Sequence, residues 1–151
     1  MVRTEVAHKI VNWARRWAQR LLVRAVPRAP HYDVILSEAV LRRPLRDRLA
    51  MARQLEALVM ASRQPNVKFR VLPLAAGLFR WAETGTSTVL DFPTHVREPE
   101  PTTVYKDGPC GAAYLDKPHE IQTYEEAWHS LGERALDVDD SRELITAIAR
   151  R

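Results

Sequence analysis

The stretch 32-YDVILSEAVLRRP-44 carries the strongest indication of fold in this chain. Alternation from Tyr32 places apolar side chains on both sides of the segment, which is typical of a central strand covered on at least one face. Directly after this strand come Glu38, Arg42, Arg43 and then a proline. If the chain turns helical at this point, Glu38 and Arg42 are four residues apart and can pair.

The carboxylate and its two guanidiniums have more than one interpretation. An ion pair of Glu38 with Arg42 or Arg43 can orient a carboxylate or phosphate ligand through charge-assisted hydrogen bonds. Ligands of sheet proteins often collect beyond strand ends, so we expect Glu38 to border the main cavity. The simpler interpretation is a structural ion pair, because such pairs are common at surfaces. We predict the pairing and leave its role open.

The N-terminal segment is predicted to be a basic amphipathic helix over residues 4–25. Its apolar residues recur at helical spacing, and they are Val6, Ile10, Trp13, Trp17 and Leu21. We expect Trp13 and Trp17 to dock on the rest of the chain or on a partner, since Trp is a favoured interface anchor. Residues 1–28 carry a net charge of +6 within a total of +4. We therefore divide the chain into a connecting helix, 1–28, and a binding domain, 29–151.

The remaining segments predict an α+β fold. A strand is expected at residues 67–73, whose alternation leaves the face of Lys68 and Arg70 wet, and further strands are expected at 86–93, 102–106 and 112–115. Helices are expected at residues 45–63, after Pro118, and in a final segment where Asp140 and Glu143 resemble a capping box. This order indicates a mixed or mostly antiparallel sheet covered by helices on one face.

Composition excludes several classes of function. The single cysteine permits no internal disulfide, which fits a reducing cytoplasm. No apolar stretch approaches the 18 residues or so of a membrane span, and the five scattered glycines form no phosphate-binding loop. The histidines show no zinc-ligand spacing, so we expect neither metal nor cofactor. Cys110 with His119 can be written as a nucleophile and its base, but a small residue in a Gly-Pro turn is the simpler interpretation of Cys110.

Several stretches together resemble one known family. The chain is similar, from about residue 6 to residue 149, to the DUF5753 domain of actinobacteria, also called the Scr1-type antitoxin-like transcriptional regulators. The stretches that carry the resemblance are, in order, YDVILSEAVLRRP, QLEALVMASRQPNVKFRVLPLAAG, STVLDFP, TVYKDG, YLDKPHEIQTYEEAWHSLGERAL and DSRELITAIA. The sequence departs from the family pattern at LFRWAETGTST and THVREPEPT, which flank the middle strands.

The resemblance implies a sensing or partner-binding domain that controls a DNA-binding unit. In typical members the domain follows an Xre-type helix-turn-helix, and a small DUF397-type protein is often encoded beside it. Met1 stands almost directly before the connecting helix, so we expect no DNA-reading unit and no sequence-specific DNA binding. The expected partners are a DUF397-type protein, a small-molecule ligand or a second copy of the chain.

An enzyme is the alternative from a different class. A stand-alone copy of such a domain can reuse the effector pocket for acid–base chemistry, which needs a positioned group of suitable pKa. Glu38 would then be the acid or base, with Arg42, Tyr105 and His119 orienting the substrate. A neighbouring DUF397-type gene would favour the regulator, whereas a biosynthetic gene cluster would favour the enzyme.

Overall fold

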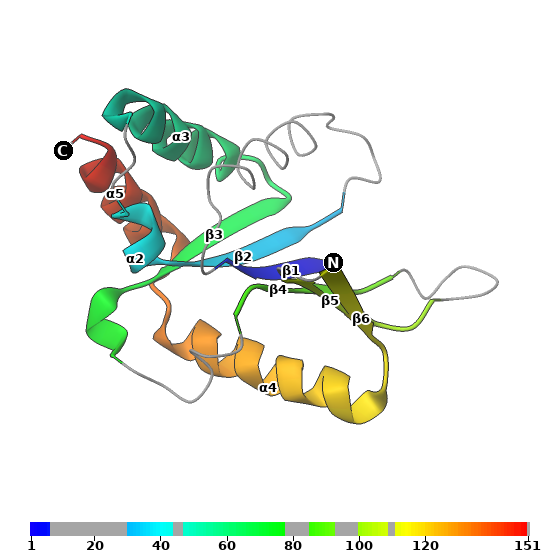
Figure 1. The fold of residues 1–151 in the computed structure, drawn as a ribbon. Coiled ribbons are helices and arrows are strands. Elements are labelled where there is room, and N and C mark those ends of the chain that lie inside the picture. Colours follow the sequence, from blue (N-terminus) through cyan, green and yellow to red (C-terminus); the bar gives the residue numbers. More distant parts are fainter. Residues whose placement is uncertain (7–29, 44–46, 78–84, 93–99, 109–110, 151) are drawn as a thin grey trace.

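The computed structural model of the chain describes residues 1–6, 30–43, 47–77, 85–92, 100–108 and 111–150, with the backbone alone described for 2–6 (Figure 1). The strands are β1 (Val2–Val6), β2 (Tyr32–Ser37), β3 (Val67–Leu72), β4 (Ser87–Leu90), β5 (Thr103–Gly108) and β6 (Gly111–Leu115). The helices are α2 (Glu38–Leu41), α3 (Arg48–Ala61), the 3₁₀ helix η1 (Leu74–Ala76), α4 (Pro118–Arg134) and α5 (Val138–Ala149). The α+β class predicted from the sequence is confirmed.

The strands form one mixed sheet in the order β3-β2-β1-β4-β5-β6. Strands β1, β2 and β3 run parallel, and β4, β5 and β6 continue the sheet in antiparallel fashion from β1. Parallel neighbours need a crossover connection, which α2 and α3 provide between β2 and β3. β5 and β6 form a hairpin in which Gly108 pairs with Gly111. The sheet therefore has a parallel half, β1 to β3, and a hairpin half, β4 to β6.

Strand β2 is central, as its sequence predicts. It lies between β3 and β1, and Val34, Ile35 and Leu36 are all buried. Consecutive strand residues point to opposite faces, so burial of three in a row means that both faces are covered. The apolar residues on both sides of the quoted stretch are explained by this position.

Helices cover both faces of the sheet, and the expectation of a single covered face was wrong. Val67, Phe69 and Val71 pack into one cluster with residues of α3 and α5, whereas Arg70 lies against Trp128 of α4. These residues alternate along β3, so α4 must lie on the opposite face (Figure 1). The Arg70 face had been expected to be wet. It carries a guanidinium because that group has a partner on α4.

The main core belongs to the parallel half. Apolar side chains from β2, β3, α2, α3 and α5 form one buried cluster, in which each large side chain contributes roughly 1.5–3 kcal/mol. Its members are Val34, Leu36, Val40, Leu41, Leu55, Leu58, Ala61, Val67, Phe69, Val71 and Ile145. Ile35, Val104 and Leu131 are also buried but lie outside this cluster. The alternation of β2 puts Ile35 on the α4 face.

The N-terminus differs from its prediction. Residues 2–6 form strand β1, which pairs with β2 and β4 in the middle of the sheet. A helix beginning at residue 4 is therefore wrong for residues 4–6, because the helical spacing of the later apolar residues was extended into a strand. The rest of the expected helix, with Trp13 and Trp17, lies outside the described residues. The division of the chain at residue 28 stays a prediction.

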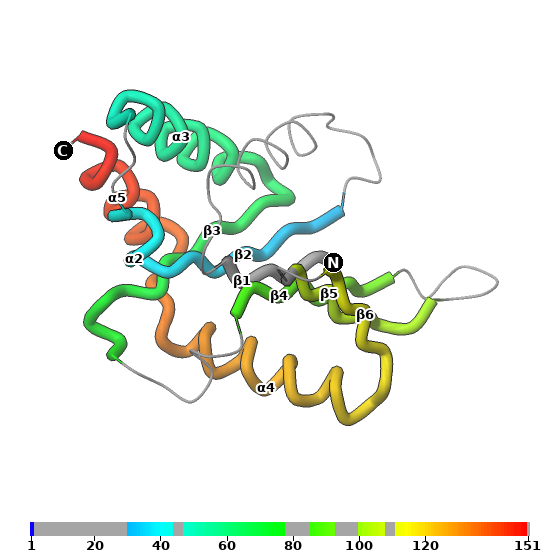
Figure 2. Tube along the Cα trace, viewed as in Figure 1, coloured from blue at the N-terminus to red at the C-terminus, as the bar shows by residue number. Residues whose placement is uncertain are grey.

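The helix α5 begins earlier than its sequence suggested. Asp137 is the N-cap, and its carboxylate accepts hydrogen bonds from the backbone N–H of Asp139 and Asp140 at 2.9 and 2.8 Å. The capping box expected at Asp140 was therefore wrong, because Asp137 offers the same chemistry one turn earlier. Figure 2 traces the short link from the end of α4 into this helix.

Candidate functional site

Glu38 lies at the point where β2 becomes α2, at the end of the sheet where the C-termini of β1, β2 and β3 lie. Its side chain is buried, with 7% of the residue exposed. One carboxylate oxygen, Oε1, accepts a hydrogen bond from Nε of Arg42 at 2.6 Å. The other, Oε2, accepts from the backbone N–H of Leu74 at 2.8 Å. The predicted pairing of Glu38 with an arginine four residues later is confirmed.

These two hydrogen bonds join separate elements. Arg42 closes α2, whereas Leu74 begins η1 after β3. The carboxylate therefore fixes the end of β2 to the segment that follows β3, across two neighbouring parallel strands. Arg43 is exposed at the end of α2, and its backbone N–H donates to the carbonyl of Val40.

The pKa of Glu38 follows from this environment. Burial of the carboxylate acts to raise its pKa, but the hydrogen bonds from Leu74 and Arg42 and the charge of Arg42 outweigh burial. The net result is a pKa below the ordinary value of 4.5. General acid–base catalysis works best with a pKa near the operating pH. Glu38 is therefore better suited to a permanently ionised structural role.

The other residues proposed for an enzyme lie elsewhere. Tyr105 is in β5, three strands away from β2 in the sheet, and its ring contacts Tyr114 at 5.2 Å between centroids. His119 is exposed in the first turn of α4. That turn follows β6, whose last residue, Leu115, pairs near the start of β5. The start of β5 and the end of β6 lie at the opposite end of the sheet from Glu38. The structure therefore does not bring the three residues together.

A second polar cluster was not foreseen from the sequence. Nε and Nη2 of Arg70 donate to Oδ1 and Oδ2 of Asp33 at 3.3 and 3.2 Å. The guanidinium carbon of Arg70 lies 5.5 Å from the centre of the Trp128 ring. A Cβ on Gly132 would meet Nη1 of Arg70 at 3.2 Å. This cluster fastens α4 to β2 and β3. Asp33 and Arg70 are diagonal neighbours because of the register between β2 and β3. The sequence alone does not specify this register, so it could not predict the cluster.

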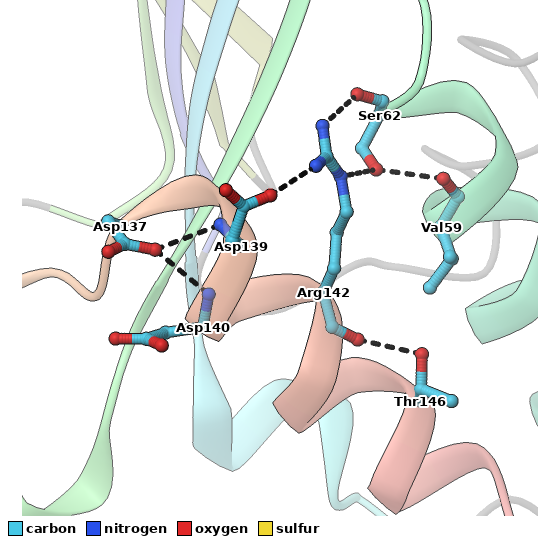
Figure 3. A network of polar contacts seen from close by, with 7 residues as sticks. All are labelled: Val59, Ser62, Asp137, Asp139, Asp140, Arg142 and Thr146. Carbon is cyan, nitrogen blue, oxygen red and sulfur yellow. Dashed lines mark hydrogen bonds and ion pairs between the residues drawn. The ribbon is translucent and has the colours of Figure 1, made fainter.

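A third cluster, drawn in Figure 3, fastens α5 to the end of α3. Arg142 donates from Nε to Oγ of Ser62 at 3.0 Å and from Nη2 to the Ser62 carbonyl at 2.9 Å. Its Nη1 also pairs with Asp139. Ser62 is the C-cap of α3 and is buried, so Arg142 satisfies a carbonyl at the helix end. The cluster holds helices together.

Two further properties concern only the described residues. No group of three His, Cys, Asp or Glu side chains in the described ranges could hold a metal ion. No helix there is long and apolar enough to cross a membrane. Cys110, like Trp13 and Trp17, lies outside those ranges, so its pairing with His119 stays untested.

The mixed sheet, with helices on both faces and a buried carboxylate at the end of β2, defines an α+β domain whose family can be stated. The chain belongs to the family described as Domain of unknown function (DUF5753), whose model matches residues 3–147. The match covers all but the first residue of the sheet and all but the last two residues of α5, and it includes the three polar clusters. Neither the curated proteins nor the solved structures include a match to this chain.

Proposed function

We propose that this chain is a cytoplasmic regulatory domain that binds a protein partner or a small-molecule ligand and performs no catalysis. The observation that carries the proposal is the use of Glu38. Both of its oxygens accept hydrogen bonds from neighbouring elements, and these bonds hold its pKa below the ordinary value of 4.5. The groups expected to assist it lie elsewhere, Tyr105 in β5 and His119 in the first turn of α4.

The resemblance described above favours a small DUF397-type protein as the partner. The test is a calorimetric titration of the purified chain with the DUF397-type protein encoded nearest to its gene. Saturable binding at equimolar ratio supports the proposal. If no such protein binds, a thermal-shift screen with small metabolites tests the ligand-binding form. A failure of both would overturn the proposal.

One substitution can distinguish a structural role of Glu38 from a role in ligand binding. If the carboxylate is structural, Glu38→Gln lowers the melting temperature and leaves partner or ligand affinity intact. If it contacts the ligand, the same change abolishes binding with little effect on melting. Arg43→Gln is the matched control, because this exposed arginine follows the same short helix directly after its C-cap, Arg42. If the natural chain turns over a substrate and Glu38→Gln abolishes that turnover, the protein is an enzyme instead.

Direct DNA reading is not part of the proposed function. The basic residues 1–28, with their net charge of +6, can attract phosphates, but such attraction is independent of sequence and sensitive to salt. Anisotropy titrations with several duplexes at about 150 mM salt should show no preference among them. Protection of one operator in a footprint would contradict this.

A further inference from the structure

The two edge strands of the sheet, β3 and β6, have different surroundings. At the β3 edge, the backbone N–H of Val71 donates to Oγ of Ser141 at 2.8 Å, and its carbonyl accepts from Leu136 at 2.9 Å. At the other edge, β6 has β5 as its sole strand neighbour among the described residues. The first four residues of β6, 111–114, are exposed. One edge is capped by α5 and its preceding link, whereas no described strand pairs with the outer side of the other.

Strand β6 also lacks the usual protection of an open edge. Natural proteins block edge strands with charged residues, prolines or bulges, because unpaired N–H and C=O groups recruit other strands. The sequence of β6 is GAAYL, which contains none of the charged residues or prolines. Its side chains are small apart from Tyr114, which is 69% exposed, and Leu115. The backbone of β6 is therefore accessible to another strand.

We propose that β6 is the dimerisation edge of this protein and that its partner is β6 of a second copy. A two-fold axis at Ala113 would pair the strands antiparallel, with Ala113 opposite Ala113 and Ala112 opposite Tyr114 of the other chain. Such an interface is self-complementary, as a two-fold dimer requires. Each Tyr114 ring then covers a small Ala112, and no like charges meet because β6 carries none.

The helices leave room for this pairing. In the joined sheet, the two β5 strands would be separated by three strand spacings, or roughly 14 Å at about 4.8 Å each. Helix α4 contacts the β5 region, since Tyr124 packs against Lys106. Packed helices need about 8–10 Å between their axes, so the two α4 helices have room where Tyr124 lies over β5. The contact is small, and the dimer should be weak and dependent on concentration.

A disulfide at the axis tests the geometry directly. Antiparallel residues facing each other across a non-hydrogen-bonded pair have Cα atoms about 4.5 Å apart, within the range for a disulfide. In a Cys110→Ser background, which removes the only native cysteine, Ala113→Cys should oxidise to a covalent dimer. Ala57→Cys, on the exposed side of α3, is the control. We expect Ala113→Cys to cross-link at least about tenfold faster; equal rates would overturn the proposal.

A measurement on the unaltered chain guards against a misfolded variant. Sedimentation equilibrium should show monomer and dimer exchanging with concentration. Hydrogen exchange at the Ala112 and Tyr114 amides should slow as the protein concentration rises, while exchange at buried Val104 stays constant. A monomer at every concentration, with exchange of β6 unchanged, would refute the dimer, even if a different protein strand bound there.

Discussion

The two halves of the sheet use their side chains in different ways. In the parallel half, Asp33, Glu38 and Arg70 each contact another element and hold it in place. In the hairpin half, residues 111–114 of β6 are exposed. The connections explain the contrast. Parallel strands need long crossovers whose ends must be fixed, whereas a hairpin is closed by its own short turn. The hairpin half therefore keeps a surface that is available for binding.

The largest test of this contrast compares an aromatic residue from each half. Phe69 is 1% exposed in β3, whereas Tyr114 is 69% exposed in β6. Phe69→Ala should lower the free energy of unfolding by about 3–5 kcal/mol, because it leaves a cavity in the main core. At low protein concentration, Tyr114→Ala should cost only about 0.5–1.5 kcal/mol, because it removes the exposed cross-strand contact with Tyr105. Urea unfolding of both variants measures the difference, and similar losses would mean that the hairpin is as tightly packed as the core.

The next test concerns the two hydrogen bonds that Glu38 accepts at the end of the parallel strands. Glu38→Gln should cost about 1.5–3 kcal/mol near pH 7, because the amide oxygen can accept only one of the two hydrogen bonds and the NH2 group cannot accept the other. The pKa of Glu38 is lower in the folded protein than its ordinary value of 4.5. The unfolded chain therefore takes up the proton first. The ionised carboxylate stabilises the fold above about pH 4.5, and this stabilisation is lost as the pH falls through the folded pKa.

The pH dependence gives this prediction its control. The stability difference between the natural chain and Glu38→Gln should be constant at neutral pH and should shrink steadily below about 4.5. Denaturant melts from pH 3 to pH 8 provide the measurement. A difference that stayed the same at acid pH would show that the pKa of Glu38 is not lowered by folding.

The sequence predicted what depends on local pattern. Strand β2, the alternating strand β3 and the pair of Glu38 with Arg42 all follow from spacings of two or four residues. Contacts between distant segments were out of reach. The bond of Glu38 to Leu74 joins residues 36 positions apart. The placement of α4 beneath Arg70 depends on strand order, which periodicity does not specify. Strand β1 was missed because its five residues precede a longer helical pattern.

A smaller effect should separate the two edges of the sheet. Ser141→Ala removes the acceptor for the backbone N–H of Val71, and both residues are fully buried. Leaving that donor unpaired should cost about 1 kcal/mol or more, and exchange of the Val71 amide should accelerate. Thr123→Ala is the control, because Thr123 is exposed and its hydroxyl donates to the His119 carbonyl within α4. If both variants lost the same stability, the β3 edge would not be held by α5.

The smallest expected effect concerns the face of the sheet that α4 covers in both halves. Gly132 lies in the last turn of α4, and replacing a helical Gly by Ala normally stabilises a helix by up to about 0.5–1 kcal/mol. A methyl group there would meet Nη1 of Arg70 at 3.2 Å. Arg70 is held by Asp33 and by the Trp128 ring, so it cannot move aside without weakening those contacts. The gain from the added methyl should therefore be cancelled while Arg70 is present.

A double-mutant cycle tests this coupling. Gly132→Ala should leave the natural chain unchanged or slightly less stable, but in an Arg70→Ala background it should raise the free energy of unfolding by about 0.5–1 kcal/mol. The exposed His129 on the same helix supplies the control, since His129→Ala should have the same effect in both backgrounds. An additive cycle for Gly132 and Arg70 would mean that the guanidinium yields freely. In that case the cluster would not fix α4 to the parallel half, and the contrast between the halves would rest on the core and on Glu38 alone.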